Sequence, residues 1–138
     1  TRESCTGGML ASLLTDIEGC GHGFDRAFVT YTSEAKQELL GVPAELVERN
    51  EAVNAEAAKA MAEGALSRCK AHIALSVTGF AGPSKEENEE GLVYMACARR
   101  DGATREEERH FGAIGRGPVR IEALKVMIDM MCHAIDEA

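Results

Sequence analysis

Residues 73–78, Ile73-Ala74-Leu75-Ser76-Val77-Thr78, decide the fold class. Their nearly continuous run of small and β-branched apolar residues is typical of a strand that is covered on both faces. Such a strand needs a layer of helices on each side. The stretch therefore predicts an α/β fold in which residues 73–78 form a central strand.

The segments around this strand supply the covering helices. Apolar residues recur at helical spacing, and capping residues mark the ends. Ser33 is expected to cap one short helix that stops at Gly41, and Asn54 to cap a long Ala-rich one. Helices are expected over residues 9–17, 33–40, 43–48, 55–70 and 118–138.

Two further regions predict the rest of the sheet. Residues 27–32 are rich in β-branched and aromatic side chains, which favours a strand. Residues 92–98 and 104–111 flank Asp101-Gly102, a strong hairpin signal. The order helix, strand, helices, strand, hairpin, helix predicts a single three-layer α/β domain, with helices covering a mixed parallel and antiparallel sheet.

Composition excludes several classes of protein. The chain has 138 residues and a formal charge of −8, which argues against a nucleic-acid partner. No apolar run is long enough to cross a membrane, and no signal peptide is visible. The five cysteines form no Cys-x-x-Cys pair and the four histidines have no ligand spacing, so we expect reduced thiols in a cytoplasmic protein, no metal and no cofactor.

The chain begins abruptly beside a candidate turn. Ser4-Cys5-Thr6-Gly7-Gly8 resembles a strand-to-helix turn, but only three residues precede it. A strand that feeds such a turn needs about five residues. We therefore expect a helix and most of a strand upstream of Thr1.

Three glycine-bearing turns are candidate ligand sites, although each alone is also explained as a tight turn. Ligands of open α/β sheets bind beyond the carboxyl ends of strands, and backbone N–H groups at a helix start suit an anion or an oxyanion. The turns are Ser4–Gly8, Thr78-Gly79-Phe80-Ala81-Gly82-Pro83 and Gly112-Ala113-Ile114-Gly115-Arg116-Gly117.

Ser4 is a candidate nucleophile at the start of the first helix. The N–H groups of residues 6–8 (Thr6, Gly7 and Gly8) would then lie near a reacting carbonyl. The alternative is an ordinary N-cap serine. The neighbouring Cys5 is a rival nucleophile, or a small buried apolar residue.

Tyr31 and Lys36 form a second candidate pair, because a buried lysine can serve a serine as general base. The alternative for Lys36 is a solvated helix lysine. Ser33-Glu34-Ala35-Lys36 also matches the Ser-x-x-Lys motif of penicillin-recognising enzymes, but their partner motifs are absent from this chain. Ser33 is therefore interpreted as a helix cap.

Charged residues near the turns receive weaker assignments. Lys85-Glu86-Glu87-Asn88-Glu89-Glu90 is interpreted as a solvated loop. Arg116, in a glycine-rich loop, is a candidate phosphate ligand. Arg120 is interpreted as a member of a surface ion pair.

Taken together, six ordered motifs resemble the carboxyl-terminal domain of the CinA family of competence/damage-inducible proteins, over essentially the whole chain. They are Glu3–Gly8, Tyr31–Lys36, Leu39–Pro43, Ala60–Ala65, Thr78–Pro83 and Phe111–Arg120. The resemblance implies a nicotinamide-nucleotide amidase that converts nicotinamide mononucleotide to nicotinic acid mononucleotide and ammonia, without a metal. It implies Ser4 as nucleophile, Lys36 as base and Tyr31 as a third member of the proton path.

The resemblance also suggests which residues bind the substrate. Thr78, Gly79 and neighbouring residues Ala81 and Gly82 would line the nucleotide site, together with Arg116 and the turn at residues 6–8. A homodimer or a higher homo-oligomer is expected, and the Met-rich last helix is a candidate interface. Core packing is the alternative for that helix.

This chain departs from the family pattern in the acidic run 85–90, where the family has glycines, and at Glu51 and Asn54, where Gly and Ser are common. Acidic residues there would disfavour a phosphate. Two alternatives therefore stay open. One is a non-catalytic nucleotide-binding or oligomerisation module, and the other is a serine amidase for a different small carboxamide.

Overall fold

A computed structural model describes residues 1–19 and 21–137 of the chain. It contains a five-stranded sheet with the strand order β2-β1-β3-β4-β5. β1 pairs in parallel with β2 and β3, whereas the β3–β4 and β4–β5 pairs are antiparallel, which confirms the predicted mixed sheet. The strands are β1 (Arg2–Glu3), β2 (Phe28–Val29), β3 (Ile73–Gly79), β4 (Leu92–Arg99) and β5 (Arg105–His110).

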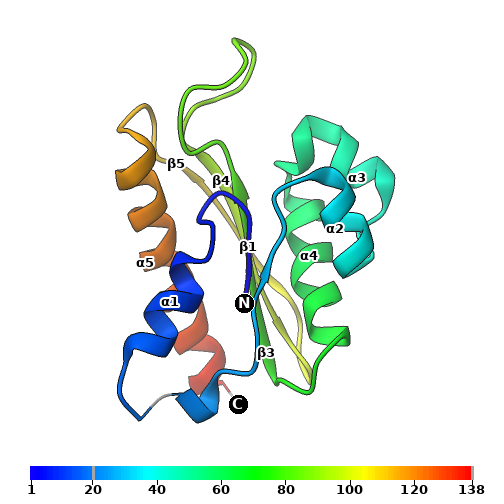
Figure 1. Cartoon of the computed structure of the whole chain (residues 1–138), viewed down its shortest axis with the longest axis vertical. Helices are drawn as coiled ribbons and strands as arrows, with labels where there is room; N and C mark the ends of the chain where they lie inside the picture. The colour runs from blue at the N-terminus through cyan, green and yellow to red at the C-terminus, as the bar shows by residue number, and fades with distance from the viewer. Residues whose placement is uncertain (20, 138) are drawn as a thin grey trace.

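The helices form two outer layers, as Figure 1 shows. α1 and α5 cover one face of the sheet, and α2, α3 and α4 cover the other. The predicted three-layer α/β architecture is therefore confirmed. The helices are α1 (Met9–Asp16), α2 (Ser33–Leu40), α3 (Ala44–Glu48), α4 (Ala55–Ser67) and α5 (Arg116–Asp136), with short 3-10 turns η1 (Gly21–Gly23) and η2 (Arg49–Ala52).

β3 is buried on both faces, as the sequence of residues 73–78 predicts. Leu75 and Val77 belong to the apolar cluster under α1 and α5. Ala74 belongs to the cluster under α4, and the Ser76 hydroxyl on that same face donates a hydrogen bond to the Ala58 carbonyl oxygen of α4 at 2.6 Å. Successive side chains of a strand point to opposite faces, so each helical layer receives every second residue.

The helix caps differ from the prediction in one place. The prediction that Ser33 caps α2 is wrong, because the Thr32 hydroxyl accepts the Ala35 N–H at 3.1 Å and Ser33 is the first helical residue. A capping oxygen must come from the residue with extended backbone just before the helix. Gly41 ends α2 with φ +66°, and the Asn54 side chain caps α4 through the Ala57 N–H, as expected.

Other helix and strand boundaries differ from the predicted ones. β2 covers only Phe28–Val29 of the predicted strand 27–32, since its partner β1 offers two paired residues. α5 begins at Arg116 rather than at Pro118.

Met127 and Met130 of α5 are buried against the sheet of their own chain. Cys20 lies outside the described residues.

No helix in the described part of the chain has both the length and the apolar character that a membrane crossing requires.

Candidate functional site

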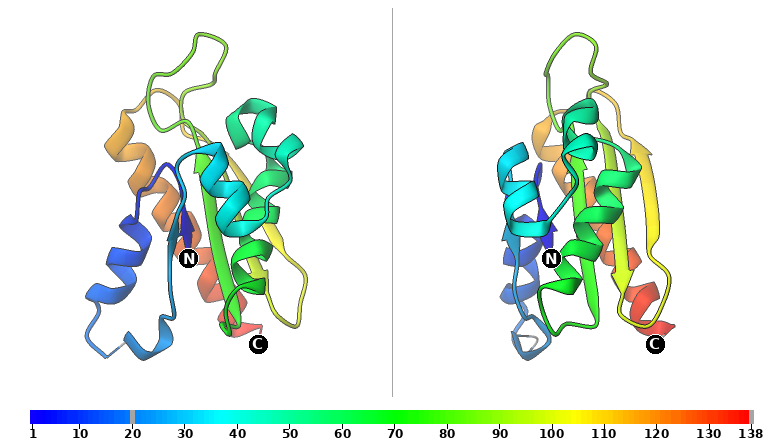
Figure 2. Two further views of the ribbon diagram at one scale, coloured as in Figure 1. Left: turned by 45° about the vertical axis from the view of Figure 1, so that its right-hand side comes forward. Right: turned by 90° about the vertical axis from the view of Figure 1, so that its right-hand side faces the viewer.

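The predicted catalytic residues gather at one end of the sheet, where β1 and β3 finish. They line a pocket of about 510 Å³. The β3–β4 loop protrudes from the body above this end, as both Figure 1 and Figure 2 show. The pocket is lined by Ser4, Cys5, Tyr31, Thr32, Ser33, Lys36, Glu51, Val53, Thr78, Gly79, Phe80, Ala81, Gly82, Pro83, Ser84 and Arg116.

Ser4 lies in a tight turn between β1 and α1. The turn closes with a hydrogen bond from the Gly7 N–H to the Ser4 carbonyl oxygen at 3.1 Å. Gly7 and Gly8 have φ of +58° and +101°, which only glycine adopts without strain. Ser4 is 8% exposed and faces the pocket. It is not the N-cap of α1, because that position is Gly8.

Glu3, which the sequence analysis did not single out, organises this turn. Its fully buried carboxylate accepts hydrogen bonds from the Thr6 hydroxyl at 2.6 Å and from three backbone N–H groups at 2.7–3.1 Å. Those N–H groups belong to Gly8, Leu10 and Ala11, at the start of α1. The first turn of a helix leaves such donors unsatisfied, and Glu3 supplies the missing acceptor.

The bonds of the turn decide which N–H groups remain for an oxyanion. Those of Gly7 and Gly8 are engaged by the Ser4 carbonyl and by Glu3. Within the described residues, the N–H groups of Cys5 and Thr6 have no such acceptor and are the donors left in this turn. Thr6, Gly7 and Gly8 shape the Ser4 backbone, but none of them lines the pocket.

Lys36 points into the pocket from α2 and is only 4% exposed. Burial lowers the pKa of its ammonium group below the usual 10.5, and the positive charge of Arg2 lowers it further. Its Nζ donates a hydrogen bond to the Tyr31 carbonyl oxygen at 3.2 Å. In the described part of the chain no hydrogen bond joins Nζ to the Ser4 hydroxyl, so the pair shares a pocket without being in direct contact.

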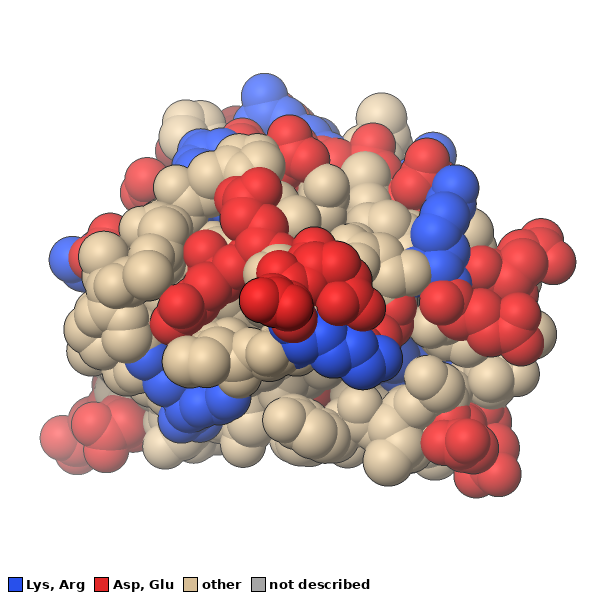
Figure 3. Space-filling view, turned by 90° about the horizontal axis from the view of Figure 1, so that it is seen from above, with Lys and Arg blue, Asp and Glu red and all other residues tan. Residues whose placement is uncertain are grey.

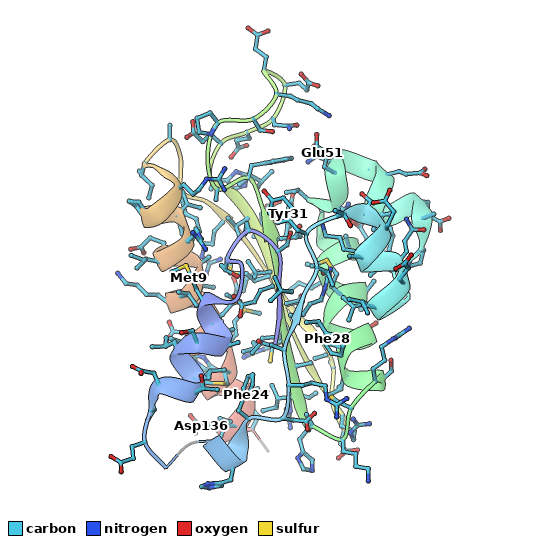
Figure 4. All side chains as sticks on the ribbon, viewed as in Figure 1. Met9, Phe24, Phe28, Tyr31, Glu51 and Asp136 are labelled. Atoms are coloured by element: carbon cyan, nitrogen blue, oxygen red, sulfur yellow. The ribbon has the colours of Figure 1, made fainter. Side chains whose placement is uncertain are left out.

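Tyr31 lies on the rim of the same pocket. Its backbone holds Lys36, while the residue as a whole is 71% exposed. Figure 4 places Tyr31 between the two helical layers, at the end of the sheet from which the β3–β4 loop protrudes. The side chain of Tyr31 is therefore open to solvent at the pocket mouth.

The second glycine-bearing turn, Thr78–Pro83, forms another wall of the pocket. The Thr78 hydroxyl is buried and donates to the Ala52 carbonyl oxygen at 3.1 Å, which ties β3 to η2. A side chain at Gly79 would come within 2.7 Å of the Leu92 carbonyl oxygen, so the close approach of β4 requires glycine there. Ala81 and Gly82 are also in the lining, as predicted from the motif.

The two arginines of α5 have different surroundings. Arg116, in the first turn of the helix, lines the pocket, and its guanidinium packs on Gly82. In the described part of the chain it forms no ion pair, so its charge is available to a ligand. Arg120 donates to the Thr6 carbonyl oxygen at 2.9 Å, so its interpretation as a surface ion-pair residue is wrong and it braces the Ser4 turn.

Glu51 contributes an acidic group to the pocket. Its sequence motif did not predict this position. Asn50, Glu51 and Ala52 all have positive φ, of +53°, +56° and +67°, which is unfavourable for residues other than glycine. This explains physically why glycine suits position 51. The Glu51 carboxylate forms an ion pair with Lys85 at 2.6 Å, which links η2 to the β3–β4 loop (Figure 4).

The acidic run of the β3–β4 loop stays outside the pocket. The lining stops at Ser84 and includes none of the four glutamates at positions 86, 87, 89 and 90. Seen from above in Figure 3, acidic side chains gather at the centre of this end, with basic side chains between them. Glu89 pairs with His110 of β5. The glutamates of the loop therefore place negative charge around the pocket but not in its walls.

Cysteine and metal chemistry receive little support from the geometry. Burial raises the pKa of the Cys5 thiol to about 11, so at neutral pH it is not the nucleophilic thiolate. Among residues 1–19 and 21–137, no group of three His, Cys, Asp or Glu side chains is placed to hold a metal ion. A second pocket of about 510 Å³ lies at the opposite end of β3 and contains none of the predicted site residues.

Comparison with known proteins places these observations in a family. The model of the CinA C-terminal domain matches residues 1–135. A putative competence-damage inducible protein of Caldicellulosiruptor bescii is 46% identical over 112 residues, which are 80% of this chain and 27% of that protein. A CinA-like protein of Akkermansia muciniphila is 47% identical over 78% of this chain and 26% of its own length. The chain thus spans about a quarter of these relatives.

Solved structures agree with the fold. The competence/damage inducible protein CihA of Agrobacterium tumefaciens superposes with a TM-score of 0.92 at 41% identity, covering 96% of this chain and 82% of that one. A CinA superfamily protein of Escherichia coli gives 0.87 at 32% identity, covering 95% and 76%.

Proposed function

The chain belongs to the family of CinA C-terminal domains, and from this premise we propose that it is a serine amidase that deamidates nicotinamide mononucleotide to nicotinic acid mononucleotide and ammonia. The observation that carries the proposal is the shared pocket: a serine in a glycine turn and a buried lysine with a lowered pKa face the same cavity. A lysine of that kind is suited to activate a serine.

The proposed reaction starts with proton transfer within this pocket. Neutral Lys36 accepts the proton of the Ser4 hydroxyl as the oxygen attacks the carboxamide carbon, which the pyridinium cation makes more electrophilic. The N–H groups of Cys5 and Thr6 are the donors proposed for the resulting oxyanion. Because Lys36 does not contact Ser4 in the free protein, substrate binding must bring the two together, as is common for catalytic hydrogen bonds.

The second half of the reaction releases ammonia and the acid. Lys36, directly or through the exposed Tyr31 hydroxyl, returns the proton to the amide nitrogen, which leaves as ammonia while an acyl-enzyme forms on Ser4. Water then attacks the acyl carbon and restores the serine. The net reaction consumes one amide and one water and yields one carboxylic acid and one ammonia.

Recognition of the nucleotide requires a separate anion site. Arg116 is the proposed phosphate ligand, because its guanidinium lines the pocket and forms no ion pair in the described part of the chain. The small residues at positions 79, 81 and 82 leave room beside it.

The test compares ammonia release from nicotinamide mononucleotide by the wild type, Ser4→Ala and a matched control, Ser12→Ala, whose serine lies on the exposed face of α1. We expect release by the wild type and the control and none by Ser4→Ala. If the wild type binds the nucleotide without releasing ammonia, the domain is a non-catalytic nucleotide-binding module. If it prefers carboxamides that lack the phosphate, it is an amidase for another substrate.

A further inference from the structure

Arg2 is a fully buried cation in the middle of the sheet. It lies on β1, in register with Phe28 of β2 and Ser76 of β3. The Ser76 side chain bonds to α4, and residues in register on parallel strands point to the same face. Arg2 therefore points into the layer formed by α2 and α4, behind the wall of the pocket that holds Ser4 and Lys36.

The guanidinium of Arg2 has no counter-charge there. Its Nε donates to the Thr30 hydroxyl at 2.9 Å, one terminal nitrogen bonds to the same oxygen, and the other has no partner. No ion pair within the described residues includes Arg2. Burial lowers the pKa of Arg2 to about 9, which is still above neutrality, so an uncompensated positive charge remains in the core at neutral pH. A buried charge without a carboxylate is unfavourable for folding.

The head groups of Arg2 and Lys36 are held by two consecutive residues of the chain. Arg2 is bound to the side chain of Thr30, and the Lys36 ammonium is bound to the carbonyl oxygen of the next residue, Tyr31. Both cations are nearly inaccessible to water. Two like charges in the same buried, low-dielectric region repel each other more strongly than they would in water.

The other groups that face Lys36 do not cancel this repulsion. Cys5, which follows β1, is a neutral thiol at physiological pH. Glu51 of η2 is solvent-exposed and already paired with Lys85. The Tyr31 carbonyl supplies a dipole but no charge. Among these groups, Arg2 is therefore the one that carries a buried full charge at neutral pH.

We propose that the buried guanidinium of Arg2 keeps Lys36 in its neutral, proton-accepting form by repelling the ammonium form. Arg2 does not line the pocket and so acts through Lys36, as a positioning residue rather than a catalytic one. The inference rests on the proposed function, in which Lys36 is the general base. Desolvation and the charge of Arg2 are the two largest causes that lower the pKa of Lys36, in that order.

The test measures the protonation of Lys36 directly. The side-chain ¹⁵N resonance of Lys36, identified by its loss in Lys36→Arg, is titrated in the wild type and in Arg2→Met. We expect the pKa of Lys36 to rise by about one pH unit in Arg2→Met, because a repulsive charge is removed. The acidic limb of the kcat/KM profile should move to higher pH by the same amount, with a loss of about tenfold at neutral pH that high pH restores.

Matched variants separate charge from packing. Arg2→Lys keeps the charge and should leave the pKa of Lys36 near its wild-type value. Arg2→Gln, which removes the charge but can still donate to Thr30, should raise that pKa as Arg2→Met does, and it replaces Arg2→Met if the latter fails to fold.

The inference is overturned if the pKa of Lys36 is unchanged in folded Arg2→Met or Arg2→Gln, both of which lack the charge at position 2. It is also overturned if the pKa of Lys36 rises as much in Arg2→Lys as in Arg2→Met. The NMR titration needs no substrate, so it decides the role of Arg2 even if the wild type does not deamidate the nucleotide.

Discussion

The inner wall and the outer rim of the candidate site are built in opposite ways. The inner wall carries Ser4 and Lys36, both nearly inaccessible, and is braced by the buried Glu3 carboxylate and by Arg120. The outer rim carries Tyr31, Glu51 and residues 83–87 of the β3–β4 loop, which are exposed and joined by surface contacts such as the Glu51–Lys85 pair. Buried hydrogen-bonded groups are costly to disturb, whereas exposed pairs contribute about 0–1 kcal/mol.

This difference suggests a division of roles. The inner wall holds Ser4 and Lys36, the proposed reacting groups, among buried and hydrogen-bonded neighbours, which restricts their positions as the proposed catalysis requires. The rim tolerates unusual residues, including the glutamates of the loop and the strained Glu51, because changes there disturb little of the core. Substitutions in the inner wall should therefore change activity or stability more than substitutions in the outer rim, and in different ways.

Lys36→Arg should have the largest effect, since arginine keeps the positive charge but cannot become a neutral base. We expect kcat to fall by about 10²–10⁴-fold, the range of general-base contributions. The measurement is steady-state ammonia release, with Lys59→Arg on the exposed face of α4 as the control. Full activity in Lys36→Arg would contradict the proposed base.

The same lysine should set the pH dependence of the proposed activity on the acidic side. Because the pKa of Lys36 is lowered from 10.5, its neutral form is available at lower pH than for an ordinary lysine. We expect kcat/KM to rise with pH and its midpoint to lie below 10.5.

Glu3→Ala should break the inner wall itself. It removes the acceptor of four hydrogen bonds and leaves buried donors at the start of α1 unsatisfied. We expect the free energy of unfolding to fall by about 3 kcal/mol, measured by urea denaturation. Glu3→Gln keeps one acceptor oxygen and should lose less. Equal stability of Glu3→Ala and the wild type would show that the turn does not depend on this carboxylate.

Arg116→Met should affect binding without affecting the fold. Arg116 is exposed and its guanidinium lies beside Gly82 in the pocket wall, so its loss should remove one charge-assisted contact to the phosphate. We expect KM for nicotinamide mononucleotide to rise about tenfold, which corresponds to roughly 1.4 kcal/mol, with kcat little changed. A fall in kcat with unchanged KM would assign Arg116 to the chemical step instead.

Glu51→Gly should stabilise the protein slightly. Glycine relieves the strain of φ +56°, and the exposed ion pair with Lys85 offsets only a small part of the gain. We expect the free energy of unfolding to rise by about 1 kcal/mol. Glu51→Gln keeps the strain and should stay within about 0.5 kcal/mol of the wild type. Destabilisation by glycine would mean that the ion pair outweighs the strain.

The smallest effect is expected in the acidic loop. Glu86 and Glu87 are exposed and outside the pocket lining. The double variant Glu86→Gln/Glu87→Gln should change KM by less than about twofold at physiological ionic strength, since salt screens such charges. A tenfold decrease in KM would show instead that the loop repels the phosphate, as the composition alone suggests.

Local pattern was sufficient for most of the fold. The apolar run 73–78 and the Asp101-Gly102 hairpin signal identified β3, β4 and β5. Boundaries that depend on a partner were less predictable. β2 is short because β1 offers only two residues to pair with, and α2 is capped by Thr32 because that residue, not Ser33, has the extended backbone.

The candidate site was predictable only where a motif carries it. Ser4, Lys36, Thr78 and Arg116 were named from motifs, and all four line one pocket. Glu3, Arg2 and Arg120 were missed as site residues, because their importance lies in burial and in contacts across the fold, such as the bond from Arg120 to the Thr6 carbonyl. The cue for Glu3 was present but weak: a charged residue on the strand expected to lead into the Ser4 turn.

The sequence by itself determined the layers, the types of the elements and the choice of the proposed reacting groups, since periodicity, glycine positions and motifs are local properties of the chain. Only the tertiary structure decided that Glu3 occupies the N–H groups of α1, that the loop glutamates stay outside the pocket, and that Arg2 and Lys36 share a buried region without a carboxylate between them. Those facts depend on which segments meet in space. In addition, a charge interacts more strongly with its neighbours when it is buried, because the local dielectric constant is low.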